Sequence, residues 1–146
     1  MFFGTFQNSI DDKGRCMIPS KFRNELGETC MLVMGADKCL YIYTVEAYKR
    51  FLDEHLLNRP FEDKSARKLK RFYAANSRDC DIDKQGRINL PQKFINFAGI
   101  VKETVTLGNI EHVEIWSKER YESEMDSESI DPDALFADML KYVDGA

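Results

Sequence analysis

The apolar positions of this chain follow two spacings, one typical of β-strands and one typical of α-helices. In the first half, β-forming residues predict short extended segments within residues 2–10 and strands at 15–18, 29–34 and 40–43. Helical spacing predicts a short helix and two longer ones, at residues 21–26, 45–57 and 65–75. Short strands and helices alternate in this way along the chain, which predicts an α+β fold with a mainly β core.

Side chains at the helix ends and along the helix faces sharpen this prediction. Ser20 and Thr44 are the expected N-caps of the first two helices, because a hydroxyl oxygen can accept a bond from a free amide of the first turn. The 45–57 helix carries an apolar face, formed by Val45, Tyr48, Phe51, Leu52 and Leu56. The 65–75 helix is expected to turn Leu69, Phe72 and Tyr73 inward and Arg67, Lys68, Lys70 and Arg71 outward.

The first half of the pattern returns in the second half. Asp11–Phe22 recurs as Asp83–Phe94 at a constant offset of 72, with Asp, Gly, Arg, Pro, Lys and Phe at identical places. After one inserted residue, Leu40–Thr44 matches Val113–Ser117. A match of this length predicts a tandem duplication. Each copy has only roughly 45 residues, near the size at which a lone core fails, so the two copies should pack together.

The duplication divides the chain into four expected parts. They are a first module at residues 5–47, a helical linker at 48–75, a second module at 76–119 and an acidic helical tail at 120–146. Ser117 should cap the final helix of the second copy, at 118–125, and Asp131–Pro132 should begin a helix in the tail. This tail helix carries an apolar stripe, expected to pack on the body or on a neighbouring subunit, formed by Leu135, Phe136, Met139, Leu140 and Val143.

The net charge of −4 is unevenly distributed. Residues 1–116 contain 18 basic and 16 acidic side chains, whereas residues 117–146 contain 3 and 9. The tail therefore accounts for the negative total, and the body carries a small positive charge. A polyanionic partner is not excluded, since the local pattern of charge decides such binding.

The repeated Asp-x-x-Gly-Arg turn is the strongest candidate site. Gly14 and Gly86 allow a positive φ, and Asp11 and Asp83 can bond the backbone of their turns. A purely structural role, in which each arginine pairs with its aspartate, explains Arg15 and Arg87 less well, because a solvated turn satisfies its aspartate without them. Further basic residues surround the first turn (Lys13, Lys21 and Arg23) and the second (Lys84 and Lys93). Arginine and lysine on a rigid turn suit phosphates and guanine edges, which predicts DNA binding.

Other classes of function have little support in the sequence. The four cysteines, Cys16, Cys30, Cys39 and Cys80, include no Cys-x-x-Cys pair and have no histidine nearby, so we expect small buried side chains in a reducing compartment and no metal. His55 and His112 have no suggestive nucleophile beside them, which argues against an enzyme, a cofactor or a small-molecule substrate. No apolar run approaches the roughly 20 residues that cross a bilayer, so a cytoplasmic protein is expected.

Three features together resemble the MraZ family of bacterial transcriptional regulators. They are the opening Met-Phe-x-Gly, the first turn followed by Ile18-Pro19, and the second turn followed by Leu90-Pro91. The resemblance runs from Met1 to about Tyr121. It implies two SpoVT-AbrB modules that form a swapped-hairpin β-barrel, and subunits that assemble into a ring-shaped homo-oligomer. The family's DNA-contacting arginine falls on Arg15, and the matching position in the second copy is Arg87.

The resemblance also implies a biological role. Members of the family bind short direct repeats of double-stranded DNA upstream of their own promoter, at the head of the division and cell-wall gene cluster, and mostly repress transcription. A nucleoid-associated location follows from that role.

The second copy departs from the first, because Gln85 stands in the place of Lys13 and Ile95 in the place of Arg23. We therefore expect the first turn to bind DNA more strongly. The alternative is an interaction module that does not bind DNA, either an AbrB-like antitoxin or a scaffold whose acidic tail docks a protein partner.

Overall fold

The computed structural model describes residues 1–125 and 130–142. Its eight strands, all within the two predicted modules apart from the first residues of β1, are β1 (Phe2–Ser9), β2 (Arg15–Met17), β3 (Thr29–Met34), β4 (Leu40–Tyr43), β5 (Ser77–Asp81), β6 (Arg87–Asn89), β7 (Glu103–Ile110) and β8 (His112–Ser117). Its six α-helices are α1 (Ser20–Leu26), α2 (Val45–Leu52), α3 (Lys64–Ala75), α4 (Gln92–Ala98), α5 (Lys118–Glu124) and α6 (Pro132–Met139).

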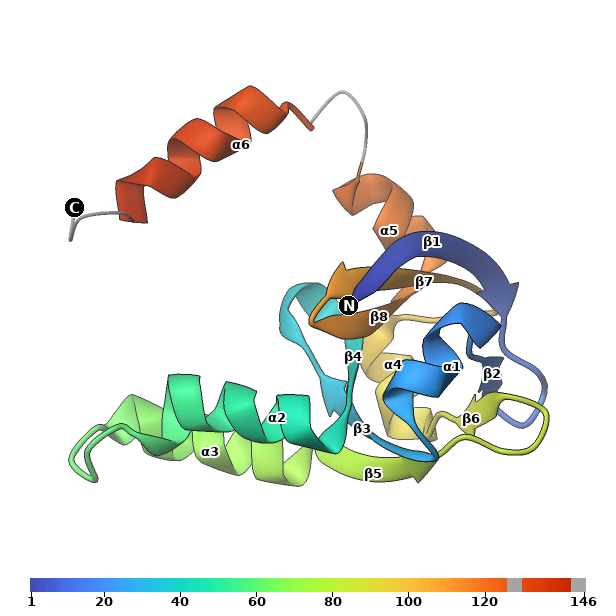
Figure 1. The fold of residues 1–146 in the computed structure, drawn as a ribbon, viewed down its shortest axis with the longest axis horizontal. Helices are drawn as coiled ribbons and strands as arrows, with labels where there is room; N and C mark the ends of the chain where they lie inside the picture. The colour runs from blue at the N-terminus through green and yellow to red at the C-terminus, as the bar shows by residue number, and fades with distance from the viewer. Residues whose placement is uncertain (126–129, 143–146) are drawn as a thin grey trace.

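Six of the strands form one antiparallel sheet in the order β1-β7-β8-β4-β3-β5, and β2 pairs with β6 in a separate two-stranded ribbon. Figure 1 shows the sheet curving around α1 and α4, with α2 and α3 projecting as a pair from one side. The fold is therefore α+β with a mainly antiparallel β core, as the sequence predicts.

Most of the strand pairing joins one copy of the repeat to the other. Only β3–β4 and β7–β8 pair within a copy, whereas β1–β7, β3–β5, β4–β8 and β2–β6 cross between copies. The exchange is reciprocal, because β1 precedes the first turn and pairs with β7, and β5 precedes the second turn and pairs with β3. Neither copy completes a sheet from its own strands.

The first strand differs from its prediction. Short extended segments were expected within residues 2–10, but β1 is continuous over Phe2–Ser9 and follows β7 residue by residue from Ile110 to Glu103. Its partner lies about a hundred residues further along the chain. The pattern of residues within 2–10 does not indicate pairing with so distant a strand. The length of β1 therefore cannot be predicted from neighbouring residues alone.

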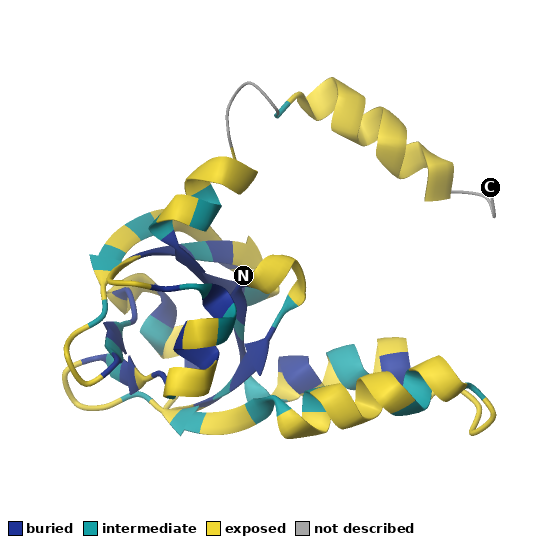
Figure 2. Cartoon of the chain, turned by 180° about the vertical axis from the view of Figure 1, so that it is seen from behind, coloured by how far each residue is buried: buried dark blue, intermediate teal, exposed yellow. Residues whose placement is uncertain are grey.

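Both copies contribute to the main hydrophobic core. Phe22 on α1 and Phe94 on α4, equivalent residues of the repeat, are both buried in it. The rings of Phe2 and Phe6 on β1 meet Phe22 edge-on, at centroid distances of 5.5 and 5.3 Å. Figure 2 shows this buried region enclosed by the sheet. Burying side chains of this size contributes about 1.5–3 kcal/mol each, and neither copy encloses them alone.

The helix ends test the capping predictions. The hydroxyls of Thr44 and Ser117 accept bonds from the amides of Ala47 (3.0 Å) and Arg120 (3.1 Å), so both predicted caps are confirmed. The prediction for Ser20 is wrong, because Ser20 is already the first residue of α1 and Pro19 occupies the cap position without a side-chain bond. The backbone of Pro19 is not helical, and α1 begins at Ser20, one residue earlier than the sequence predicts.

The apolar face of α2 is buried or half-buried as predicted, and α2 continues into a π-helical turn, η2 (Asp53–Leu57). The prediction for α3 is only partly right. Tyr73 packs edge-on against Phe51 at 5.6 Å, but Leu69 and Phe72 are exposed. Arg67, expected to point outward, instead lies over the ring of Phe61 and donates to its carbonyl. Helical spacing identifies the apolar face, but α2 covers only part of that face.

The tail helix α6 begins as predicted, with the Asp131 carboxylate accepting a bond from the amide of Asp133 at 3.1 Å. It ends in a short 3-10 turn, η3 (Leu140–Tyr142). Its stripe residues Leu135, Phe136, Met139 and Leu140 are all exposed, and Figures 1 and 2 show α6 apart from the body. Packing of this stripe on the chain's own body is therefore not observed. Val143 lies outside the described residues.

Candidate nucleic-acid interface

The first Asp-x-x-Gly-Arg turn is held together by Asp11. One carboxylate oxygen accepts bonds from the amides of Lys13 and Arg15, both at 2.9 Å, and the other accepts a bond from Nε of Arg15 at 2.6 Å. Gly14 closes the turn by donating its amide to the carbonyl of Asp11 at 2.9 Å, with a φ of 77° that favours glycine. Asp11 therefore fixes both the turn and the direction of the arginine side chain.

The second turn repeats this arrangement. Asp83 accepts bonds from the amides of Gln85 and Arg87, both at 2.9 Å, and from Nε of Arg87 at 3.0 Å. Gly86 donates to the carbonyl of Asp83 at 2.9 Å. The two turns thus share the same hydrogen bonds, although Gln85 stands in the second turn where Lys13 stands in the first.

Each arginine bonds its aspartate through Nε, which leaves the terminal amino groups at the outer end of the guanidinium. The side chains of Arg15 and Arg87 are 33% and 25% exposed. The Arg15 amide, with further help from the guanidinium and the Lys13 amide, holds the pKa of Asp11 below its ordinary value. The pKa of Asp83 is lowered in the same way, chiefly by the Arg87 amide. Both aspartates are therefore ionised at neutral pH and keep their arginines oriented.

The two turns lie side by side. Pairing of β2 with β6 places Arg15 opposite Asn89 and Met17 opposite Arg87. The glycine carbonyl of each turn also accepts a hydrogen bond from the other copy. The Ile18 amide donates to the Gly86 carbonyl at 2.8 Å, and the Leu90 amide donates to the Gly14 carbonyl at 2.9 Å.

One contact joins the two charged pairs directly. Nη1 of Arg87 lies 4.0 Å from the Asp11 carboxylate that also binds Arg15. The two arginines therefore belong to one composite surface, which is at the end of the molecule where β2 and β6 meet in Figure 1.

A helix from the opposite copy lies behind each turn. Ile95 on α4 lies against Gly14, and the guanidinium of Arg23 on α1 lies against Gly86. Nε of Arg23 also donates to the carbonyl of Ile18 at 2.8 Å, and the side chain is half-buried. The structure therefore places Arg23, a predicted DNA contact, behind the second turn. The sequence did contain a sign of this placement, because the equivalent residue of the second copy is the apolar Ile95. A position that is apolar in one copy often faces inward in both.

The lysines of the candidate site remain on the surface. Lys13 and Lys84 lie at the tips of the two turns, and Lys21 and Lys93 lie on α1 and α4; all four are exposed. Because the Arg23 guanidinium bonds the Ile18 carbonyl and lies against Gly86, it adds less to the charge difference that we expected between the two turns. The first turn carries Asp12 at the position where the second carries Lys84, so local charge no longer favours the first.

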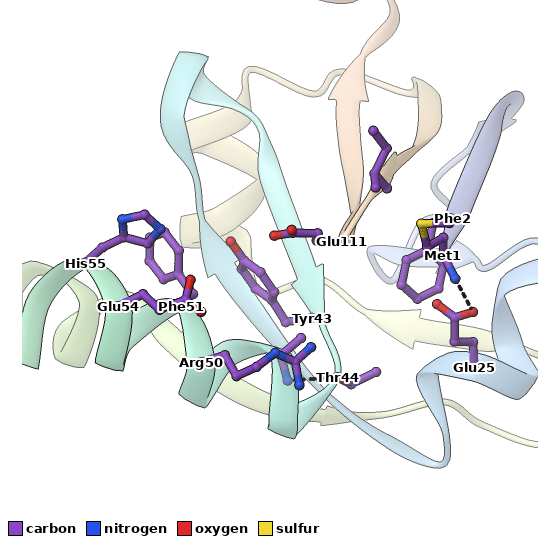
Figure 3. A pocket seen from close by; sticks show the side chains of 12 residues that line it. Met1, Phe2, Glu25, Tyr43, Thr44, Arg50, Phe51, Glu54, His55 and Glu111 are labelled. Carbon is purple, nitrogen blue, oxygen red and sulfur yellow. Dashed lines mark hydrogen bonds and ion pairs between the residues drawn. The ribbon is translucent and has the colours of Figure 1, made fainter. Parts of the chain in front are cut away.

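A separate pocket of about 340 Å³ lies between the N-terminus, β4 and α2 (Figure 3). In it the terminal amine of Met1 bonds Glu25 at 2.8 Å, and the ring of His55 packs on Phe51 at 5.0 Å between centroids. Among the described residues, no hydrogen bond in this pocket joins a nucleophile to a base. The pocket offers no catalytic arrangement that competes with the paired turns as the candidate site.

No group of three or more histidine, cysteine, aspartate or glutamate side chains within residues 1–125 and 130–142 is arranged to hold a metal ion. No helix in those same ranges is long and apolar enough to cross a membrane.

Comparison with known proteins adds an independent line of observation. A family model described as "MraZ protein, putative antitoxin-like" matches residues 1–72 and 74–141. The chain is 46% identical to Transcriptional regulator MraZ of Lachnoclostridium phytofermentans, over 84% of this chain and 86% of that protein. It is 43% identical to the protein of the same name from Clostridium tetani, over 87% and 89%, and 40% identical to that from Acetivibrio thermocellus, over 92% and 94%.

The chain therefore belongs to the MraZ family. The family match reaches residue 141, further than the sequence motifs indicated, and it includes α6.

The paired turns predict a measurable difference between two glycines. Gly14 and Gly27 both have a positive φ, 77° and 81°. A Cβ atom added at Gly14 would lie 2.9 Å from the carbonyl oxygen of Leu90, whereas a Cβ atom added at Gly27 would have no neighbouring atom within 4 Å. Gly27→Ala should lower the free energy of unfolding by about 1–3 kcal/mol through backbone strain alone, because a φ of 81° with a ψ of −172° is a conformation found essentially only in glycine. Gly14→Ala should lower it by at least about 1 kcal/mol more, because the contact between copies is overpacked. Urea denaturation measures both, and equal losses would show that the turns are not tightly packed together.

Proposed function

We propose that this MraZ-family chain is a sequence-specific DNA-binding transcriptional regulator that contacts double-stranded DNA through its paired turns. The observation that carries the proposal is the juxtaposition of Arg15 and Arg87, each bonded through Nε to the ionised aspartate of its own turn and each partly exposed. The names of the relatives, which are transcriptional regulators, support the same class of function.

The chemistry of the turns suits this role. A guanidinium whose Nε is fixed retains two terminal amino groups, which can bond two phosphate oxygens or O6 and N7 of guanine. Fixing the side chain in advance reduces the conformational entropy lost on binding. We propose that the exposed side chains of Lys13, Lys84 and Lys21 neutralise phosphates around the arginines, and that Arg23 supports the second turn through its contact with Gly86.

The family resemblance carries the proposal further. We propose that the strand exchange between copies constitutes the swapped-hairpin AbrB-like barrel, with modules at 5–47 and 76–119, and that subunits assemble into a ring. The ring would bind direct repeats at the chain's own promoter, in the division and cell-wall gene cluster, and act there mainly as a repressor at the nucleoid. Several weak sites bound at once explain how a net-acidic chain obtains affinity for DNA.

Assembly would also give the tail a place to dock. The apolar stripe of α6 is exposed in the single chain, and a helix this short is marginal in water without a docking surface. We propose that α6 packs on an adjacent subunit, with its acidic residues kept away from DNA by like-charge repulsion.

A second candidate function is an antitoxin-like interaction module, which the description of the matching family favours. Its binding partner would be a protein rather than DNA. An electrophoretic shift assay with the DNA upstream of the chain's own gene separates the two, because only a regulator retards that DNA in preference to unrelated DNA of equal length.

Arg15→Ala should abolish the specific shift and leave the fold intact, since within residues 1–125 and 130–142 its guanidinium bonds only Asp11 of its own turn. Losing one bidentate base contact costs about 1–3 kcal/mol per subunit, and the cost accumulates over the subunits engaged. Arg87→Ala should weaken binding less, because Nη1 of Arg87 already faces Asp11. Parallel titrations measure both, with circular dichroism as the control for folding. Retained affinity in Arg15→Ala contradicts the proposal, and equal losses contradict the ranking.

Substitutions of two neighbouring aspartates distinguish the positioning of Arg15 from the effect of net charge on DNA binding. Asp11→Ala and Asp12→Ala each remove one negative charge from the first turn, but only Asp11 bonds Arg15. If Asp11 positions the arginine, Asp11→Ala should weaken specific binding about tenfold or more, whereas Asp12→Ala should leave affinity unchanged or slightly higher. Tighter binding by both variants in the same shift assay would mean that charge alone governs affinity.

Binding through several subunits makes a further prediction about the DNA. A fragment with two correctly spaced repeats should bind much more tightly than one with a single repeat, and the log–log dependence on salt should have a slope of about −4 or steeper. Fluorescence anisotropy over a salt series measures both quantities. A single repeat bound as tightly as the pair would rule out avidity.

A further inference from the structure

Two cysteines from different copies of the repeat meet on neighbouring strands. Cys30 on β3 lies opposite Cys80 on β5, and their sulfur atoms are 3.4 Å apart. The sulfur of Cys30 is also 3.6 Å from the carbonyl oxygen of Cys80. The positions are not equivalent in the repeat, and 50 residues separate them, so sequence spacing gives no sign of the pair.

The surroundings of the pair differ from those of the other two cysteines. Cys30 is buried and Cys80 is half-buried, on a strand whose Asp79 and Asp81 face solvent on either side. The bond from the Cys80 thiol lowers the pKa of Cys30 and, for the same reason, raises the pKa of Cys80. Burial raises the pKa of Cys16 to about 11, and burial also raises the pKa of Cys39.

We propose that Cys30 and Cys80 form an oxidation site, which closes into an intramolecular disulfide when the protein meets a peroxide. The two sulfurs are 3.4 Å apart, and Cys80 is half-buried rather than fully enclosed. A disulfide in a protein of a reducing compartment is generally transient and redox-sensing, which fits a pair that is held as thiols in the resting structure.

The reaction balances with peroxide as the only oxidant. Peroxide transfers one oxygen to a sulfur of the pair, which gives a sulfenic acid and one water. The second sulfur attacks the sulfenic sulfur, so an S–S bond forms, the S–O bond breaks, and the departing oxygen leaves as a second water with the remaining thiol proton. Two electrons pass from the pair of thiols to the peroxide.

The strand geometry permits this closure. Opposite residues of an antiparallel pair have Cα atoms about 4.5–5.5 Å apart, within the range of about 4.4–6.8 Å found in disulfides. The bond length of about 2.05 Å requires the sulfurs to approach by about 1.4 Å. Side-chain rotation and a small strand movement can supply that approach.

The disulfide would link β3 of the first copy to β5 of the second copy, close to the start of the second turn. Beyond Cys80, the hydroxyl of Thr29 bonds the Asp81 carboxylate at 2.8 Å, and the Ile82 amide bonds the Glu28 carbonyl at 3.0 Å. Asp83, which begins the second turn, follows directly. Oxidation therefore adds a covalent link to the strand that leads into one half of the candidate DNA surface.

The test uses the full chain, reduced, freed of reductant and treated with a small molar excess of hydrogen peroxide. Titratable thiols after denaturation should fall from four to two, with a mass loss of two hydrogens. Peptide mapping without reductant should place the bond between Cys30 and Cys80. The melting temperature should rise by roughly 5–10 °C, because the bond closes a long loop.

Two variants serve as a matched pair. Cys80→Ser should keep all three of its thiols under the same treatment, whereas Cys39→Ser, which leaves the pair intact, should lose two of its three. The map of the wild-type chain decides the question even if a variant folds poorly. Four surviving thiols, a sulfinic acid at Cys80, a disulfide to Cys16 or Cys39, or a disulfide between chains would each overturn the proposal.

Discussion

The structure depends on the exchange of strands between the two copies of the repeat. Each copy is too small to enclose a core, and each lacks the strands that would complete its own sheet. The exchange supplies both, because β1 and β5 each pair with a strand of the opposite copy while α1 and α4 fill the space between. We therefore expect the two copies to fold together rather than separately.

The same exchange creates the candidate site. A turn in each copy gives its glycine carbonyl to an amide of the other, so the turns become neighbours with a fixed separation. Within each turn an aspartate uses one oxygen for the backbone and the other for the arginine. The structural and functional readings of the Asp-Arg pair are therefore compatible, since the ion pair orients the guanidinium through Nε and leaves its outer end for a ligand.

Much of this arrangement could be predicted from the sequence where the determining contacts are local or repeated. The turns, the caps at Thr44 and Ser117 and the buried face of α2 depend on residues within a few positions of one another. Repetition of Asp-x-x-Gly-Arg identified the candidate site, because it marked the same turn twice.

Features set by distant partners escaped prediction. The length of β1 depends on β7, and the place of Arg23 depends on a turn more than sixty residues away. The contact between Cys30 and Cys80 depends on the register of β3 and β5. The exposure of Leu69 and Phe72 has another origin, because helical spacing shows which face is apolar but not how much of it a neighbouring element covers.

The central claim, that two intertwined copies form one cooperative unit, is tested most directly by native-state hydrogen exchange at two amides. Ile18 donates to Gly86, and Leu90 donates to Gly14, so each amide reports the contact between copies from one side. A single unit predicts that both exchange only through global unfolding, with the same opening free energy and the same dependence on denaturant. Exchange of one amide through a smaller, separate opening while the other stays protected would show that one copy unfolds alone, and would contradict the account.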